Sequence, residues 1–153
     1  FDTENEAQTV IFAQNLAPEL HSGDIIFLTG NLGAGKTVFA RSLIRSLSGS
    51  PELVVPSPTF TLLQTYDTPN GIIWHFDLYR LNDAEEIYEL GWEDAITEGI
   101  CLIEWPQRLQ ALAPQDHLTI DLGRDENNPD KRHISLTPSG AWRNRDVKRT
   151  TWL

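Results

Sequence analysis

Methionine is absent from the 153-residue sequence, and cysteine occurs only once. Since no methionine stands at position 1, we expect that Phe1 is not the natural start, and a lost leader stays open. The single Cys101 excludes an intrachain disulfide and a cysteine-based zinc site, and it suits a reducing compartment. Cys101 lies in the apolar run ICLI, which favours a buried, unreactive thiol. We therefore expect a cytoplasmic protein.

Long apolar runs and positive charge are also scarce. No run approaches the roughly 20 apolar residues of a membrane span, so no membrane contact is expected. Twelve basic residues face 22 acidic ones, for a net charge of −10. Nucleic-acid-binding proteins normally carry a positive surface, because contacts to phosphates dominate their affinity. The charge therefore favours a basic partner, or one small anionic ligand, over direct contact with nucleic acid.

Two continuously apolar runs, residues 25–29 and 100–103, predict strands that are buried on both faces of a parallel sheet. Helical spacing predicts a helix that begins at a capping box of Thr3 and Glu6, and another helix over residues 38–47. Further strands are predicted over residues 60–66, 72–76, 117–122 and 133–137. Short helices are predicted after a cap at Asn82 or Asp83 and after Trp105. Residues 139–153 give no clear pattern.

The stretch GNLGAGKT, residues 30–37, matches G-x-x-x-x-G-K-[ST] between a predicted strand and a predicted helix. Glycines let successive backbone N–H groups surround a phosphate at a helix N-terminus. Lys36 is expected to reach the β- and γ-phosphates, and Thr37 to offer its hydroxyl to Mg²⁺. The residues expected to bind the nucleotide are Asn31, Leu32, Gly33, Ala34, Gly35, Lys36, Thr37 and Val38. The motif predicts one P-loop NTPase domain over residues 1–153, a three-layer α/β/α fold with a largely parallel core sheet plus antiparallel strands.

Such a site also needs a carboxylate at the end of a neighbouring strand. Glu104 follows the second apolar strand, and we expect it to organise the Mg²⁺ ion; the alternative is a solvated charge. Trp105 either shields the site from solvent or simply packs.

Three further positions are candidates for the chemistry. Asp77 is expected to act as general base or to orient the attacking water, with His75 holding its rotamer through a hydrogen bond. Thr59 is a candidate for a switch position near the metal, and Arg80 for stabilising transferred charge. The alternative for each is an ordinary loop or surface residue.

The segments GNLGAGKT, SPTFTL, HFDLYRL, EEIYELGWED and CLIEWPQRL occur in one order, which resembles the bacterial TsaE (YjeE) family over about residues 3–137. The resemblance implies an ATPase needed for the threonylcarbamoyladenosine modification of tRNA, weak alone and stimulated by a TsaB–TsaD heterodimer. It implies Thr37 and Glu104 as magnesium ligands and Thr59, Asp77 and Glu104 as catalytic residues, with ATP and Mg²⁺ as cofactors. It also implies that a protein of this charge docks on partner proteins and need not touch tRNA. Residues 83–94 are a candidate for part of the docking surface, and the alternative is a plain solvated helix.

Two alternatives stay open. A small-molecule kinase is disfavoured, because such enzymes usually close an arginine-rich lid, and only Arg108 lies between Glu104 and Arg124. A nucleotide-dependent scaffold with incidental hydrolysis is the other. For the adenine ring, the sequence suggests only the region near Thr3 and the loop near Arg132.

Overall fold

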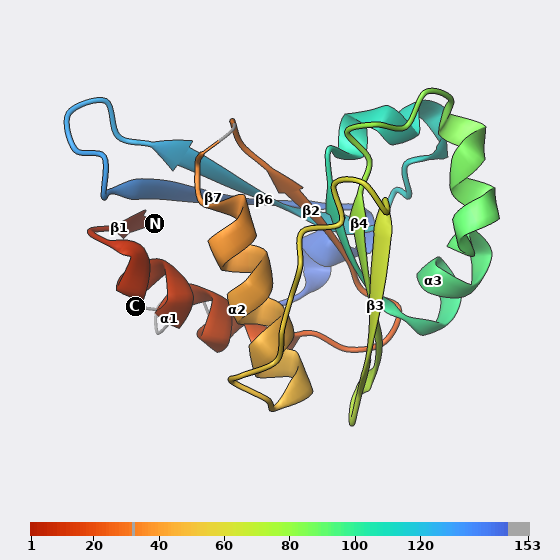
Figure 1. The fold of residues 1–153 in the computed structure, drawn as a ribbon, viewed down its shortest axis with the longest axis horizontal. Helices are drawn as coiled ribbons and strands as arrows, with labels where there is room; N and C mark the ends of the chain where they lie inside the picture. The colour runs from red at the N-terminus through yellow and green to blue at the C-terminus, as the bar shows by residue number, and fades with distance from the viewer. Residues whose placement is uncertain (32, 147–153) are drawn as a thin grey trace.

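The computed structural model describes residues 1–31 and 33–146. Within these ranges, seven strands form one sheet with helices packed against it (Figure 1). The strands are β1 (Asp2–Thr3), β2 (Ile25–Thr29), β3 (Leu63–Thr68), β4 (Gly71–Asp77), β5 (Ile100–Glu104), β6 (His117–Arg124) and β7 (Arg132–Ser139). The α-helices are α1 (Glu6–Leu16), α2 (Lys36–Ser48) and α3 (Trp92–Glu98). The 3-10 helices are η1 (Ala17–Glu19), η2 (Ala84–Leu90), η3 (Pro106–Leu112) and η4 (Gly140–Asn144).

The strand order is β1-β7-β6-β2-β5-β4-β3. The central strands β6, β2, β5 and β4 are parallel, whereas β1, β7 and β3 join in antiparallel orientation. This confirms the predicted largely parallel core with antiparallel additions. The parallel strands β2, β5 and β4 end at the same edge, with Thr29, Glu104 and Asp77 as their last residues. Open parallel sheets bind their ligands at this edge.

Alternate residues of β2 enter two separate apolar cores. Ile26 and Leu28 belong to the core that includes α1 and α2. Ile25 and Phe27 belong to the core that includes η2, α3 and η3. Figure 1 shows α1 and α2 on one side of the sheet and α3 on the other, so the predicted three-layer α/β/α arrangement is confirmed. No helix within the described ranges has the length and apolar character needed to cross a membrane.

The predicted capping box of Thr3 and Glu6 is wrong. Asn5 is the N-cap of α1, and its side chain accepts a hydrogen bond from the Gln8 N–H at 3.0 Å. Thr3 instead belongs to β1, where its buried hydroxyl lies 3.0 Å from the hydroxyl of Thr9. A two-residue strand has no periodicity of its own, which is why the sequence pattern missed β1.

Two other boundaries differ from the prediction. The strand predicted from residue 60 begins only at Leu63, and the C-terminal tail is ordered well beyond residue 139. The indole of Trp142 in η4 is buried, and the guanidinium of Arg145, which follows η4, donates to the Asp24 carboxylate at 2.6 Å. Residues 147–153 of the predicted tail lie outside the described residues.

Candidate functional site

The glycine-rich loop joins the end of β2 to the start of α2. Gly30, Gly33 and Gly35 have φ angles of 141°, 77° and 99°, which side chains rarely tolerate. A Cβ at Gly30 would lie 2.5 Å from the carbonyl oxygen of Leu122, so this position also lacks space. Gly35 is the N-cap of α2 and offers no side-chain cap, so the first N–H groups of the helix stay available to an anion.

Lys36 is held at the first residue of α2. Its Nζ donates to the carbonyl oxygen of Gly30 at 2.6 Å and lies 4.3 Å from the ring centroid of Trp105. The side chain is thus folded back over the loop, where its charge would meet a bound phosphate. Trp105 lines the cavity that the loop surrounds. This position is compatible with the prediction that Trp105 shields the site from solvent.

That cavity has a volume of about 360 Å³ and collects most of the predicted residues. Those lining it are Gly33, Gly35, Lys36, Thr37, Val38, Thr59, Asp77 and Glu104. Two predicted loop residues are not among its lining: Asn31 is exposed, and the buried Ala34 has its carbonyl turned toward Arg132. Leu32 lies outside the described residues.

Two carboxylates stand side by side at the cavity. Asp77 of β4 and Glu104 of β5 are register partners at the ends of parallel strands, and both are buried. Burial is the main cause that raises the pKa of Asp77, and the charge of Glu104 raises it further. Asp77 accepts hydrogen bonds from the Tyr79 N–H at 3.1 Å and from the Thr59 hydroxyl at 3.4 Å. Paired buried carboxylates of this kind favour a bound cation.

The donor set suits Mg²⁺. Within residues 1–31 and 33–146, no three His, Cys, Asp or Glu side chains gather into a metal site. Mg²⁺ commonly uses one or two carboxylates and completes its shell with water and substrate phosphates. Thr37 and Glu104 line the same cavity, and hydroxyl and carboxylate oxygens are among the ligands that Mg²⁺ accepts.

The expected contact between His75 and Asp77 is wrong. The buried His75 points its Nε2 at Glu104 Oε2, at 2.8 Å, on the neighbouring strand. Arg80 does not line the cavity either: it is exposed, and its guanidinium lies 4.4 Å from the ring centroid of Phe60. The alternation of side chains along β4 does not predict these contacts, because the partners of His75 and Arg80 lie on other segments of the chain.

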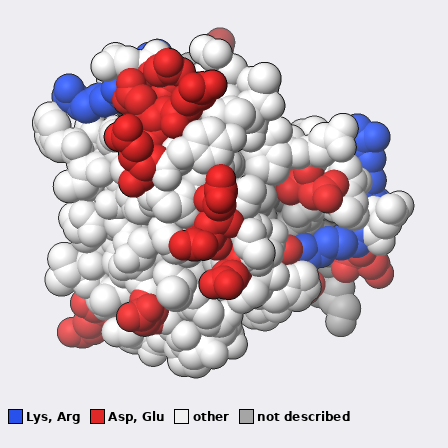
Figure 2. All heavy atoms as spheres, turned by 90° about the vertical axis from the view of Figure 1, so that its right-hand side faces the viewer, with Lys and Arg blue, Asp and Glu red and all other residues white. Residues whose placement is uncertain are grey.

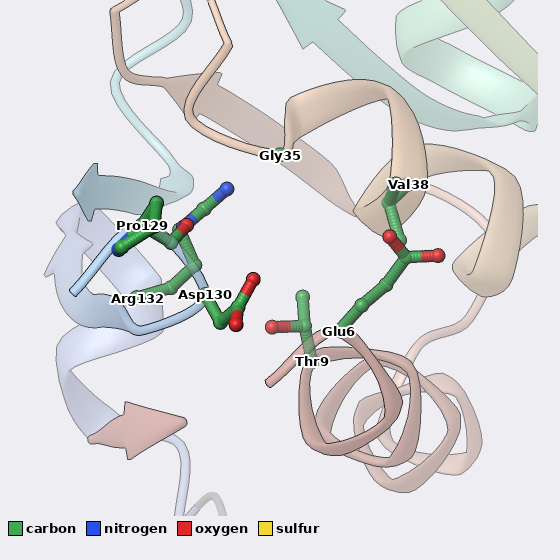
Figure 3. A pocket seen from close by; sticks show the side chains of 7 residues that line it. All are labelled: Glu6, Thr9, Gly35, Val38, Pro129, Asp130 and Arg132. Atoms are coloured by element: carbon green, nitrogen blue, oxygen red, sulfur yellow. The ribbon is translucent and has the colours of Figure 1, made fainter. Parts of the chain in front are cut away.

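Arg132 was not predicted to contact the phosphate loop. Its Nε donates to the Ala34 carbonyl at 2.8 Å, and its Nη1 donates to the carbonyls of Pro129 and Lys131 at 2.5 and 2.7 Å. Arg132 lines both the main cavity and a second one of about 80 Å³. Figure 3 shows this second cavity between α1, which contributes Glu6, and the loop before β7, with Gly35 beside it.

The family model for "Threonylcarbamoyl adenosine biosynthesis protein TsaE" matches residues 3–134. The chain belongs to the TsaE family. A Rickettsia felis protein named tRNA threonylcarbamoyladenosine biosynthesis protein TsaE is 46% identical over 138 residues, covering 90% of this chain and 78% of that protein. The Bacillus subtilis protein of the same name is 34% identical over 139 residues, covering 90% and 84%.

The fold is shared as well. The crystal structure of Bacillus subtilis YdiB superposes with a TM-score of 0.72 at 30% identity, covering 92% of this chain and 84% of that one. The resemblance to TsaE drawn from the motifs is therefore confirmed. The TsaE match spans the phosphate loop, both carboxylates and Arg132, and it ends before η4.

Proposed function

We propose that this protein is a Mg²⁺-dependent ATPase that acts in the biosynthesis of tRNA threonylcarbamoyladenosine. One observation carries the proposal: the phosphate loop, the Thr37 hydroxyl and the Asp77–Glu104 pair all line one cavity. Membership of the TsaE family supports the pathway.

In this proposal, different residues of the chain have different roles in phosphoryl transfer. Bound Mg²⁺ would supply positive charge to stabilise the phosphate oxygens. Thr37 and Glu104 would hold this ion, while Lys36 and the loop amides would bind the phosphates. Asp77 orients the attacking water and takes up its proton, a role that suits a carboxylate with a raised pKa. Thr59 fixes the Asp77 carboxylate through its hydroxyl. No covalent nucleophile is needed.

The second cavity is our candidate for the adenine ring. It adjoins the phosphate loop at Gly35 and Val38, so a nucleotide whose phosphates fill the main cavity reaches it. The carboxylates of Glu6 and Asp130 line it and offer acceptors for the exocyclic amine of adenine (Figure 3). This lies near both regions that the sequence suggested, although Thr3 itself is buried against Thr9 and does not line the cavity.

In this proposal the protein acts in the cytoplasm, and its partner is a TsaB–TsaD heterodimer. The protein itself makes no direct contact to tRNA. Figure 2 shows acidic groups spread over the face formed by the right-hand side of Figure 1, where η2 and α3 lie. The exposed acidic residues of these elements and their caps are Asp83, Glu85, Glu89, Glu93, Asp94 and Glu98. This face suits a basic protein surface and disfavours a polyanion.

Phosphate release with purified protein, alone and with TsaB–TsaD, tests the activity. We expect slow release alone, a rise with the partners, and loss of about 10²–10³-fold in Lys36→Ala, the range for removing one donor to transition-state charge. Partner-stimulated release by Lys36→Ala would contradict the assignment.

The same reaction separates the two alternatives. A phosphorylated metabolite in place of free phosphate would identify a kinase. If a variant that binds ATP without hydrolysing it sustained repeated rounds of tRNA modification, the protein would be a scaffold.

A further inference from the structure

A buried histidine lies directly behind the proposed magnesium ligand. Only 3% of the His75 side chain and 7% of the Glu104 side chain are exposed, and Nε2 lies 2.8 Å from Oε2. The register partner of His75 on β5 is the apolar Leu102, and the preceding inward residue of β4 is the fully buried Ile73. A polar ring in such surroundings is unfavourable unless a specific hydrogen bond compensates for the loss of water.

The two nitrogens of this ring have different environments. A carboxylate oxygen accepts, so Nε2 carries the hydrogen that is donated to Glu104. Nδ1 is buried and has no partner within the described part of the chain. His75 also lines a narrow hollow together with Thr37, residues 55–57 and Glu104. The hydrogen bond to Glu104 is therefore the contact that compensates for burying the polar ring of His75.

The hydrogen bond uses one carboxylate oxygen and leaves the other available. Within the described residues, Glu104 Oε1 has no hydrogen-bond partner in the protein, while the side chain lines the main cavity. A glutamate has one more rotatable bond than an aspartate, so holding Oε2 from behind limits the directions that Oε1 can take. Partners of this kind orient metal ligands.

We propose that His75 is a positioning residue that fixes the Glu104 carboxylate for the cation. The inference rests on the proposed function. His75 touches neither nucleotide nor cation; it acts through Glu104, and the hydrogen on its Nε2 sets the direction of that contact.

Two amide variants separate this role from simple packing. In His75→Gln the side-chain amide reaches the position of Nε2 and still donates to Glu104, whereas in His75→Asn it reaches only the position of Nδ1. We would measure Mn²⁺ affinity by electron paramagnetic resonance in the presence of the ATP analogue AMPPNP. His75→Asn is expected to weaken Mn²⁺ binding by roughly 10–100-fold, the range for lost partners of metal ligands. His75→Gln should retain most of the affinity, and AMPPNP binding in EDTA should not change.

A double variant tests whether His75 acts through Glu104. In a Glu104→Gln background, His75→Asn should cause little further loss of Mn²⁺ affinity, because residues in contact are not additive. Equal Mn²⁺ affinity of His75→Asn and the unchanged protein would overturn the proposal, and so would an additive loss in the double variant.

The unchanged protein gives an independent result if a variant does not fold. Nitrogen chemical shifts of its histidines should show His75 as the Nε2–H tautomer, and an Nδ1–H tautomer would refute the proposed contact. If the unchanged protein bound AMPPNP but took up no Mn²⁺ when Mn²⁺ was supplied, or if it bound neither ligand, the proposed function itself would fail.

Discussion

Replacing Asp77 by Asn should make the nucleotide-free protein more stable while it removes activity. Asp77 is only 5% exposed and stands beside Glu104, so burial and the neighbouring negative charge both disfavour its charged form. Asn keeps the local hydrogen bonds: Oδ1 accepts from the Tyr79 N–H, and Nδ2 donates to the Thr59 hydroxyl in place of accepting from it. The substitution therefore removes mainly an unfavourable charge.

The expected gain is about 0.5–2 kcal/mol, the usual range for relieving a functional site at the expense of activity. For a domain of this size, each kcal/mol corresponds to about 2–4 °C in Tm. Hydrolysis should fall by about 10²–10⁴-fold, as for loss of a general base. Asp67→Asn is the matched control, because Asp67 is exposed on the edge strand β3 and should change stability by less than about 0.5 kcal/mol.

The gain should depend on pH. Because the pKa of Asp77 is raised in the folded state, the folded protein binds more protons than the unfolded chain just above the ordinary value of 3.8. The unchanged protein therefore loses stability relative to Asp77→Asn as pH rises from 3.8 through the raised pKa, and the two converge below 3.8. Thermal unfolding at several pH values measures this difference. A variant less stable than the unchanged protein at pH 7, or a difference that does not change with pH, would refute the reasoning.

Three other substitutions test the fold around the site. Arg145→Ala should lower the free energy of unfolding by about 1–3 kcal/mol, because the buried carboxylate of Asp24 loses a charged donor. Denaturant titration measures this loss, and an unchanged midpoint would mean that the tail does not stabilise the sheet. Gly30→Ala should cost more than about 1 kcal/mol, since φ is positive and the new Cβ meets a carbonyl of β6, and a Tm equal to that of the unchanged protein would contradict the loop geometry. The hydrogen bond from His133 to Asp2 raises the pKa of His133. The stability that this hydrogen bond contributes is therefore present below the ordinary pKa of 6.5 and is lost as pH rises through the raised pKa. The stability difference between the unchanged protein and Asp2→Asn should therefore shrink as pH rises above 6.5, and a constant difference in Tm would count against it.

The sequence alone determined the phosphate loop and the strands that flank the site. Residues 30–37 are contiguous, so their match to a phosphate-binding motif follows from the sequence alone, and the positive φ angles of Gly30, Gly33 and Gly35 agree with it. Glu104 and Asp77 each end an apolar strand, and strands of a parallel sheet end at one edge, so their meeting at the cavity could be expected before the structure was known.

Only the tertiary structure decided which side chains meet across that edge. His75 contacts Glu104 and not Asp77. The register pairs His75 with Leu102, so its ring reaches Glu104 diagonally, two residues further along β5, while Asp77 accepts from Thr59 and a backbone N–H. Arg132 bonds to the loop from 98 positions away, since the β6–β7 hairpin folds back beside β2. Such contacts depend on sheet order and register, which the spacing of residues along one strand does not encode.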